Sequence, residues 1–179
     1  AARHGHAVVL VSGPVSLATP RGVRRVDVIT AQSMLEAVRM HWDWCEVLIM
    51  AAAVADWRPR NPSPIKLKKA RMATRLELDP TPDILLALAP HKGARLTVGF
   101  AAETDHLATE ARRKLKAKRL DLVVGNDVSR TDAGFEVDTN QVILLTADGR
   151  PVELPLMSKD DVAERIVRRV EELWKDSRR

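Results

Sequence analysis

The stretch VLIMAAAVA, residues 47–55, decides the fold that this sequence predicts. Almost every residue in it is apolar, which is typical of a strand that other elements cover on both faces. A membrane span needs an apolar run of about 20 residues, and no run in the chain approaches that length. Further short apolar runs, each interpreted as a strand, lie at residues 7–12, 26–30, 96–100 and 120–127.

Segments with helical periodicity separate these runs. Thr30 is a suitable N-cap for the first helix. The segment PDILLALA places Pro82 at a first helical position and Asp83 in the first turn. A charged helix is predicted over residues 104–119, and the last predicted helix is amphipathic, with its apolar side formed by Val162, Ile166, Val170 and Leu173. The alternation predicts an α/β fold of three layers, in which helices cover both faces of a mostly parallel sheet.

Two segments alternate apolar and polar residues and therefore predict half-exposed strands. They are RLELD at residues 75–79 and QVILLTADGRPVEL at residues 141–154, the second with a hairpin turn at Asp148 and Gly149. We interpret both as antiparallel strands outside the parallel sheet. Strands of this kind often form a dimer contact, so we expect them to be used in dimerisation.

The size and charge of the chain limit its class. A chain of 179 residues is long enough for one domain with a substantial core, and we expect a single domain over residues 1–179. The excess of 29 basic over 24 acidic residues suits an anionic ligand, but it also fits an ordinary basic surface. The single cysteine, Cys45, favours a reducing compartment, and we expect the cytoplasm. The five histidines are scattered, which argues against a structural zinc site.

The first residues, AARHGHAVVLVSGP, lack the order of charge, apolar stretch and cleavage site that marks a signal peptide. They have the pattern of a helix end that is capped by Gly5 and leads into a strand. We therefore expect a strand and most of a helix to precede Ala1.

Ligands of open α/β sheets bind beyond the carboxyl ends of the strands. The polar side chains that follow the predicted strands are Asp56, Lys66, Lys68, Lys69, Glu103, Asn126 and Asp127. The small residues 51–53 would let a flat ring or phosphates approach the backbone, but they would equally let a helix pack closely. Asp56 could bind ribose hydroxyls or a metal ion, or simply form a turn. A lysine such as Lys66 could stabilise phosphate charge, or it could be solvated.

The helix predicted over residues 104–119 gives a sharper indication. At about 100° per residue, Lys114 and Lys118 fall on the same face as Leu107 and Ala111. Two lysines in line with an apolar stripe either extend past the edge of the core or point into an anion site. We favour the anion site.

Several nucleotide-binding motifs are absent from the sequence. There is no G-x-G-x-x-G and no G-x-x-x-x-G-K-[ST]. The missing glycine fingerprint disfavours an oxidoreductase that binds a nicotinamide or flavin nucleotide, which is the alternative function on such a fold. A basic module that binds nucleic acid is supported only by charge, because the tryptophans do not alternate with basic residues.

Eight segments in order resemble one family of enzymes. They are VVLVSGPVSLATP, VITAQSM, AAAVADWRP, KLKK, TPDIL, VGFAAET, DLVVGNDVS and GFEVDTNQV. Together they resemble bacterial phosphopantothenoylcysteine synthetase, also called phosphopantothenate–cysteine ligase, which is commonly the C-terminal half of a bifunctional coenzyme A biosynthesis protein. The resemblance covers essentially the whole chain, and the ordered set is far more specific than any one segment.

The resemblance implies a Rossmann-like fold and a CTP-dependent ligase that works as a homodimer with a divalent cation, usually Mg²⁺. The carboxylate of 4′-phosphopantothenate would attack the α-phosphate of CTP and release pyrophosphate. The acyl-cytidylate would then react with the amine of cysteine and release CMP. The resemblance does not establish CTP over ATP, nor whether an FMN-dependent decarboxylase domain is fused to this one. Neither nucleic acid nor a membrane is an expected partner.

The resemblance also implies site residues. The nucleotide would contact the backbone of Met50, Ala51 and Ala52, the loop Pro82, Asp83, Ile84 and Leu85, and the side chains of Asp56, Phe100, Lys114 and Lys118. Lys66 matches the lysine tied to acyl-cytidylate formation, and no metal ligand is assigned. Trp57 stands where relatives often have tyrosine.

The sequence departs from the family at its start. A Gly-rich turn and an S-N-x-S-S-G-x-M-G segment should precede Ala1, and the asparagine of that segment is associated with the second half-reaction. We expect that residues 1–179 alone cannot complete the ligation.

Overall fold

The computed structural model describes residues 1–66, 75–103, 107–127, 138–147 and 149–179. Its strands are β1 (Val8–Ser12), β2 (Val23–Asp27), β3 (Val47–Met50), β4 (Trp57–Pro59), β5 (Leu78–Pro80), β6 (Leu96–Glu103), β7 (Leu122–Asp127), β8 (Thr139–Asn140), β9 (Val142–Thr146), β10 (Val152–Glu153) and β11 (Met157–Ser158). Its helices are η1 (Ala2–His4), α1 (Ala31–Met40), α2 (Ile84–Leu88), η3 (Ala89–His91), α3 (Leu107–Ala117) and α4 (Lys159–Asp176).

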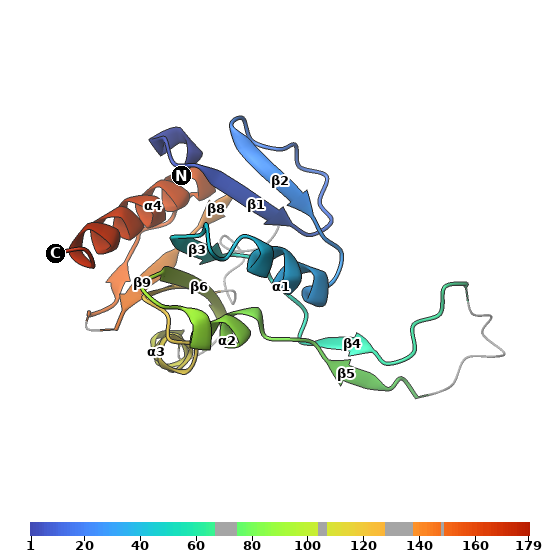
Figure 1. The fold of residues 1–179 in the computed structure, drawn as a ribbon. Helices are drawn as coiled ribbons and strands as arrows, with labels where there is room; N and C mark the ends of the chain where they lie inside the picture. The colour runs from blue at the N-terminus through green and yellow to red at the C-terminus, as the bar shows by residue number, and fades with distance from the viewer. Residues whose placement is uncertain (67–74, 104–106, 128–137, 148) are drawn as a thin grey trace.

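A five-stranded sheet in the order β10-β9-β7-β6-β3 forms the centre of the molecule (Figure 1). The strands β3, β6 and β7 are parallel, and β9 pairs antiparallel with β7. The strands β1 and β2 form a separate parallel pair. The arrangement confirms the predicted α/β fold with a mostly parallel sheet and helices on both faces.

The middle strands of this sheet are buried on both faces. Leu122 and Val124 of β7 belong to the apolar cluster that α4 covers, and Val123 belongs to the cluster that α3 covers. All three have an exposed fraction of 0%. Successive side chains of a strand point to opposite faces, so an unbroken apolar run is the pattern that such a position requires.

The first long helix begins as its sequence predicts. The Thr30 side chain accepts a hydrogen bond from the Ser33 backbone N–H at 3.0 Å, and the Thr30 N–H donates to the Ser33 hydroxyl at 3.0 Å. This reciprocal capping satisfies two backbone donors that the first turn would leave unpaired. Helix α1 buries Met34 and Leu35 in a cluster to which β1, β2 and β3 also contribute.

Four strand predictions need correction. The strand predicted at residues 26–30 is β2 at Val23–Asp27, where it pairs with β1. The strand at residues 47–55 ends at Met50, and residues 51–53 are exposed, so close helix packing is not the reason for the small residues. The strand β9 was predicted outside the parallel sheet, but it extends that sheet because Val142 and Leu145 are buried on its two faces. The strand predicted at residues 75–79 starts only at Leu78, where pairing with β4 begins.

The hairpin of β9 and β10 is confirmed, although Asp148 of its predicted turn lies outside the described residues. The charged helix predicted from residue 104 is α3, and residues 104–106 likewise lie outside them. No helix in the part of the chain that the structure describes is long and apolar enough to cross a membrane.

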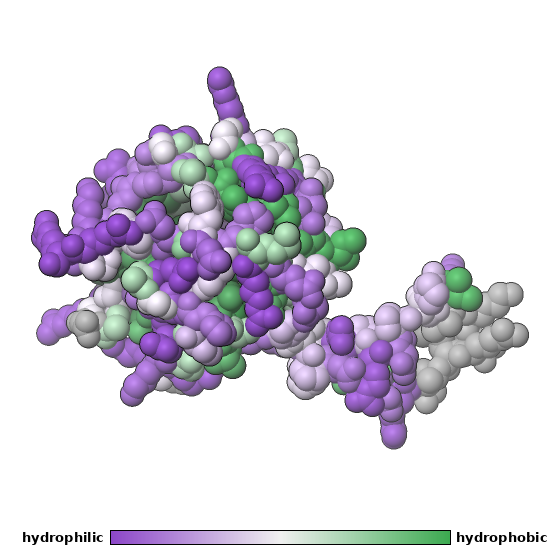
Figure 2. Space-filling view, in the orientation of Figure 1, coloured by the Kyte–Doolittle hydropathy of each residue, from purple (hydrophilic) through white to green (hydrophobic). Residues whose placement is uncertain are grey.

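The strands β4 and β5 form a two-stranded arm that extends away from the rest of the molecule (Figures 1 and 2). The Arg60 side chain bonds Asp79 at 2.8 Å and Glu77 at 3.2 Å, which holds the two chains of the arm together. The arm exposes Trp57 at 59% and Leu78 at 43%. An isolated two-stranded ribbon is at best marginally stable in water, and here it carries apolar side chains on its exposed surface.

The edges of β1 and β3 are both open in the described residues. The strand β1 pairs with β2 alone and β3 pairs with β6 alone, yet Val11 of β1 and Leu48 of β3 pack against the same cluster around α1. No residue of β1 is buried, although four of its five residues are apolar. A hollow of about 630 Å³ lies between the starts of β1 and β2 and the end of α1, lined in part by Val8 and Trp44.

The chain enters β1 from a single 3₁₀ turn. Gly5 has φ 85° and donates its N–H to the Ala2 carbonyl, in the left-handed conformation that glycine adopts without strain. The predicted helix end with a Gly5 cap is confirmed for this one turn.

Candidate functional site

The carboxyl end of β3 presents exposed backbone. Met50 packs against the clusters around α1 and α3, and Ala51 and Ala52 follow it in an exposed, irregular segment. Their methyl groups leave the backbone accessible, so amide and carbonyl groups can reach a ligand at this edge of the sheet. This is the position that the sequence predicts for nucleotide contact.

A threonine that was not singled out from the sequence fixes the path of this segment. The Thr81 backbone N–H donates to the Asp56 carbonyl at 2.8 Å, and its hydroxyl donates to the Ala55 carbonyl. These bonds join the segment after β3 to the loop before α2. The position of Thr81 directly before Pro82 and Asp83 is the only sequence signal for this role.

Asp83 is the N-cap of α2, and the helix starts at Ile84. The expectation of Pro82 as the first helical residue is wrong by two positions, because the Asp83 carboxylate accepts a hydrogen bond from the Leu86 N–H at 3.0 Å and so closes the first turn. Ile84 and Leu85 are buried beneath it, with exposed fractions of 3% and 9%.

The Lys118 ammonium lies 2.8 Å from the second carboxylate oxygen of Asp83. The pair joins the start of α2 to the end of α3. Burial acts to raise the pKa of Asp83, but the hydrogen bonds from Lys118 and from the Leu86 N–H outweigh it and lower that pKa below its usual 3.8. The carboxylate is therefore ionised at neutral pH.

The predicted face of α3 is confirmed. Lys114 and Lys118 are half-buried, while Arg112, Lys116 and Arg119 are exposed. Ala111 on the same face has an exposed fraction of 0% and packs in one cluster with Leu85 and Met50. The two lysines thus lie along the edge of the apolar contact between α3, α2 and β3.

A glycine of β6 permits this close approach. A Cβ at Gly99 would lie 2.7 Å from a methyl carbon of Leu120 and 3.2 Å from one of Leu85. A larger residue at this position would require the ends of the Leu120 and Leu85 side chains to move. Gly99 therefore lets these two leucines pack directly against the sheet.

Three predicted site residues lie apart from this pair. Phe100 alternates with Ala101 and shares a side of β6 with Val98, which is the side of α4. Asp56 is exposed at the base of the arm, and Lys66 is exposed in the segment beyond β4. Figure 1 shows that segment as part of the projecting arm. Lys68 and Lys69 and the side chains of Glu103 and Asp127 lie outside the described residues.

Asn126, at the carboxyl end of β7, has a buried amide oxygen without a hydrogen-bond partner among the residues that the structure describes. Such an oxygen is uncommon in a folded protein, because it has lost its bond to water. The sequence singled out Asn126 only by its position after an apolar run.

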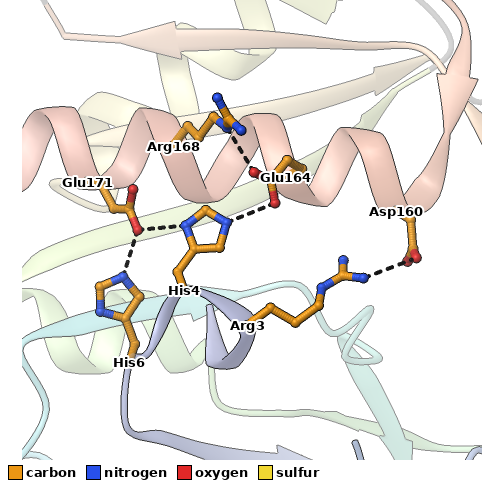
Figure 3. Close-up of polar contacts among 7 residues, drawn as sticks. All are labelled: Arg3, His4, His6, Asp160, Glu164, Arg168 and Glu171. Carbon is orange, nitrogen blue, oxygen red and sulfur yellow. Dashed lines mark hydrogen bonds and ion pairs between the residues drawn. The ribbon is translucent and has the colours of Figure 1, made fainter.

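A second polar cluster ties the amino end of the chain to α4 (Figure 3). The two ring nitrogens of His4 lie 2.8 Å from Glu164 and 2.9 Å from Glu171, and a ring nitrogen of His6 lies 2.8 Å from Glu171. No group of three or more histidine, cysteine or carboxylate side chains in the described ranges could hold a metal ion. The sequence does not indicate this cluster, because its members come from opposite ends of the chain.

These contacts shift the pKa of each partner. The bonds to Glu164 and then to Glu171 raise the pKa of His4 above 6.5. Arg168 and His4 lower the pKa of Glu164 from 4.5 to about 2, and the two histidines lower that of Glu171. At mildly acidic pH the cluster therefore consists of a charged imidazole between two carboxylates.

The comparisons with known proteins identify the family and the fold of this chain. The fold defines an α/β domain. Its candidate ligand site lies at the carboxyl ends of parallel strands. The family model described as "DNA/pantothenate metabolism flavoprotein C-terminal domain" matches residues 1–173. The chain belongs to this family.

Curated relatives include the coenzyme A biosynthesis bifunctional protein CoaBC of Bacillus subtilis, 44% identical over 174 residues, which cover 97% of this chain and 43% of the relative. The same protein of Escherichia coli K12 is 45% identical over 166 residues, covering 89% of this chain and 40% of the relative. The chain thus spans less than half the length of these relatives.

Among solved structures, the C-terminal domain of a coenzyme A biosynthesis bifunctional protein CoaBC matches with a TM-score of 0.82 and 37% identity, over 98% of this chain and 78% of that one. A Cab2 mutant in complex with phosphopantothenate-cysteine matches with a TM-score of 0.62 and 21% identity, over 87% of this chain and 55% of that one. The second match supports the fold alone.

The His4 cluster leads to a pH-dependent prediction. A raised pKa in the folded state means that the contribution of His4 to stability is complete below about pH 6.5 and is lost as the pH rises through the raised value. The contribution of the carboxylates is complete above pH 4.5 and is lost as the pH falls toward 2. We expect His4→Gln to lower the melting temperature more at about pH 5.5 than at about pH 8.5.

The matched control is Glu172→Gln, which breaks a 2.8 Å ion pair with Arg169 on the same helix. Its effect on the melting temperature should be the same at both pH values. Scanning calorimetry makes the measurement, and an equal effect of His4→Gln at both pH values would contradict the prediction.

Proposed function

We propose that this domain, together with the part of the polypeptide that precedes Ala1, catalyses the CTP-dependent ligation of 4′-phosphopantothenate to cysteine in coenzyme A biosynthesis. The observation that carries the proposal is the exposed backbone after β3 beside the half-buried lysines of α3, in a chain of the CoaBC C-terminal domain family. Curated relatives named as bifunctional coenzyme A biosynthesis proteins support it, and their length suggests a fused FMN-dependent decarboxylase domain. The free thiol of Cys45 is compatible with the cytoplasm, where we place the reaction.

The proposed reaction has two steps. A carboxylate oxygen of 4′-phosphopantothenate attacks the α-phosphorus of CTP, the P–O bond to the β-phosphate breaks, and pyrophosphate leaves. The cysteine amine then attacks the acyl carbon of the acyl-cytidylate, an amide bond forms, and CMP leaves as the amine loses a proton. The first step is needed because a free carboxylate is a poor acyl donor.

In this proposal the backbone of Met50, Ala51 and Ala52 contacts the nucleotide, and Asp56 contacts its ribose or metal. The other nucleotide contacts are Pro82, Asp83, Ile84, Leu85, Phe100, Lys114 and Lys118. Lys66 supplies positive charge to the phosphates in the first step. Mg²⁺ is expected with CTP, but the described residues gather no side-chain cluster for it, and no step is assigned to a metal.

The domain would also need a strand that precedes Ala1. The open edges of β1 and β3, which share one apolar cluster, are suited to a parallel strand that would join β1 and β2 to the central sheet. We propose that the preceding part of the polypeptide supplies this strand and the missing part of the phosphopantothenate site. Ligation assays therefore use a chain that includes it.

A comparison of ligands tests the nucleotide. CTP at about 100 times its dissociation constant should stabilise the fold by about 2.7 kcal/mol, which raises the melting temperature by about 5–10 °C. ATP, NADPH and single-stranded DNA are the comparison ligands. Stabilisation by NADPH alone would instead favour the alternative oxidoreductase, and stabilisation by DNA alone a nucleic-acid module.

The arm leads to a prediction of oligomeric state. Its exposed apolar residues Trp57, Leu76 and Leu78 are suited to a second copy of the chain, so we propose a homodimer. Light scattering should give twice the mass of one chain. Trp57→Ser together with Leu78→Ser should shift this mass toward that of a monomer, whereas Leu17→Ser, exposed on the body, should not change it. A monomer for the unchanged protein would contradict the proposal.

Lys66 leads to a catalytic prediction. Lys66→Ala should reduce pyrophosphate release from CTP and 4′-phosphopantothenate by about a hundredfold or more, because it removes a cation from the reacting phosphates. Lys116→Ala, which removes an exposed lysine from the outer side of α3, is the control and should change the rate little. Unchanged pyrophosphate release in Lys66→Ala would remove Lys66 from the mechanism.

A further inference from the structure

The imidazole of His4 bridges two carboxylates of α4 (Figure 3). Its Nδ1 lies 2.9 Å from an oxygen of Glu171, and its Nε2 lies 2.8 Å from an oxygen of Glu164. The two glutamates are about two turns apart on one face of the helix. The His4 side chain is 21% exposed, so water competes little for these bonds.

This geometry requires the charged form of His4. A carboxylate offers only acceptors, and a neutral imidazole carries a single N–H. A neutral His4 could therefore donate to one glutamate only, and its other nitrogen would direct a lone pair at the second carboxylate. The imidazolium has two N–H groups and can donate to both. The two bonds are complete only while His4 keeps its proton.

The charges on α4 favour that proton. Arg168 bonds the other oxygen of Glu164 at 2.8 Å, so this carboxylate is bound on both oxygens. Arg168 and His4 lower the pKa of Glu164 to about 2, and the bonds from His6 and His4 lower that of Glu171. Both carboxylates are therefore ionised at neutral pH, and they raise the pKa of His4 above 6.5.

The other charged groups of the segment before β1 do not need this proton. Arg3 pairs with Asp160 of α4 at 3.7 Å, with both side chains largely exposed. His6 makes one bond, to the same oxygen of Glu171, and a neutral ring has the single N–H that this bond takes. The dependence on protonation thus belongs to His4.

The contacts of His4 determine how the chain enters the domain. The turn η1 has no buried residue, and its backbone bonds lie within the segment itself. In the described part of the chain, the polar side-chain contacts of residues 1–6 all go to α4. The segment therefore has little apolar packing to hold it if these contacts weaken.

We propose that His4 is a proton-dependent lock that docks the chain before β1 onto α4 and releases it as the pH rises. Loss of the proton removes one of the two bonds and leaves a lone pair against a carboxylate. The polypeptide before Ala1 continues from this turn, so the lock also positions that part. This consequence rests on the proposed function, in which the preceding part supplies the missing portion of the phosphopantothenate site. His4 is thereby a positioning residue for that substrate.

Two substitutions fix the lock in its two states. His4→Gln cannot become charged, whereas His4→Arg is always charged and has a fork of donors for both carboxylates. Millisecond hydrogen exchange of the Gly5 N–H, which bonds the Ala2 carbonyl at 3.0 Å, reports release of the turn. Each rate is divided by that of an unstructured peptide of the same sequence at the same pH. The protein used includes its preceding strand.

The unchanged protein should lose at least about fivefold in protection between about pH 6 and about pH 8.5, because a charge-assisted bond is broken. His4→Arg should stay protected at both pH values, and His4→Gln should be weakly protected at both. The matched control His6→Gln keeps a donor for Glu171 and should retain the pH dependence. Equal protection of the unchanged protein at the two pH values, or a pH dependence that persists in His4→Arg, would overturn the lock.

Ligation kinetics test the effect on the substrate separately. The KM for 4′-phosphopantothenate of the unchanged protein, divided by that of His4→Arg, should rise at least about twofold over the same pH range, while the ratio of the kcat values stays constant. A constant KM ratio would overturn the positioning role and leave the lock to the exchange result. Absence of ligation in every variant would contradict the proposed function, and the exchange experiment would still decide the lock.

Discussion

Two-sided burial of β6 and β7 is the constraint on which the rest of the structure depends. Val98, Leu122 and Val124 have no exposed surface, and they lie between the sheet and α4. Strands in that position cannot satisfy their backbone groups with water, so every neighbour must continue the hydrogen-bonded ladder. The strands β6 and β7 meet this requirement by pairing on both of their edges, and because β3, β6 and β7 run parallel, the carboxyl ends of the three strands lie at one edge.

The candidate site lies where that burial ends. The strand β3 stops at Met50 and the chain continues in exposed alanines, so backbone groups that no longer belong to the ladder become available to a ligand. On the α3 side, the absence of a side chain at Gly99 lets Leu85 and Leu120 reach the sheet. The same packing that excludes water from the core thereby sets Asp83 beside Lys118.

The contacts outside the core differ in kind from those within it. The arm of β4 and β5, the open edges of β1 and β3, and the cluster of His4 with Glu164 and Glu171 all lie where the central sheet gives no support. The arm and the open edges expose apolar surface, whereas charged side chains hold the His4 cluster together. These are the parts of a domain in which a second subunit, a further strand or the pH has the largest effect.

The sequence by itself determined the two most deeply buried strands, β6 and β7, the caps at Gly5 and Thr30, and the inward face of Lys114 and Lys118. Burial and helix capping can be predicted from short stretches of sequence, because they depend on apolar runs and on the spacing of a few residues. The resemblance to the ligase family was likewise visible in short segments. Only the tertiary structure decided which residues meet: β9 with β7, Asp83 with Lys118, and His4 with α4. A local pattern shows that a side chain will be covered or charged, but its partner is chosen by packing between segments that are distant in sequence.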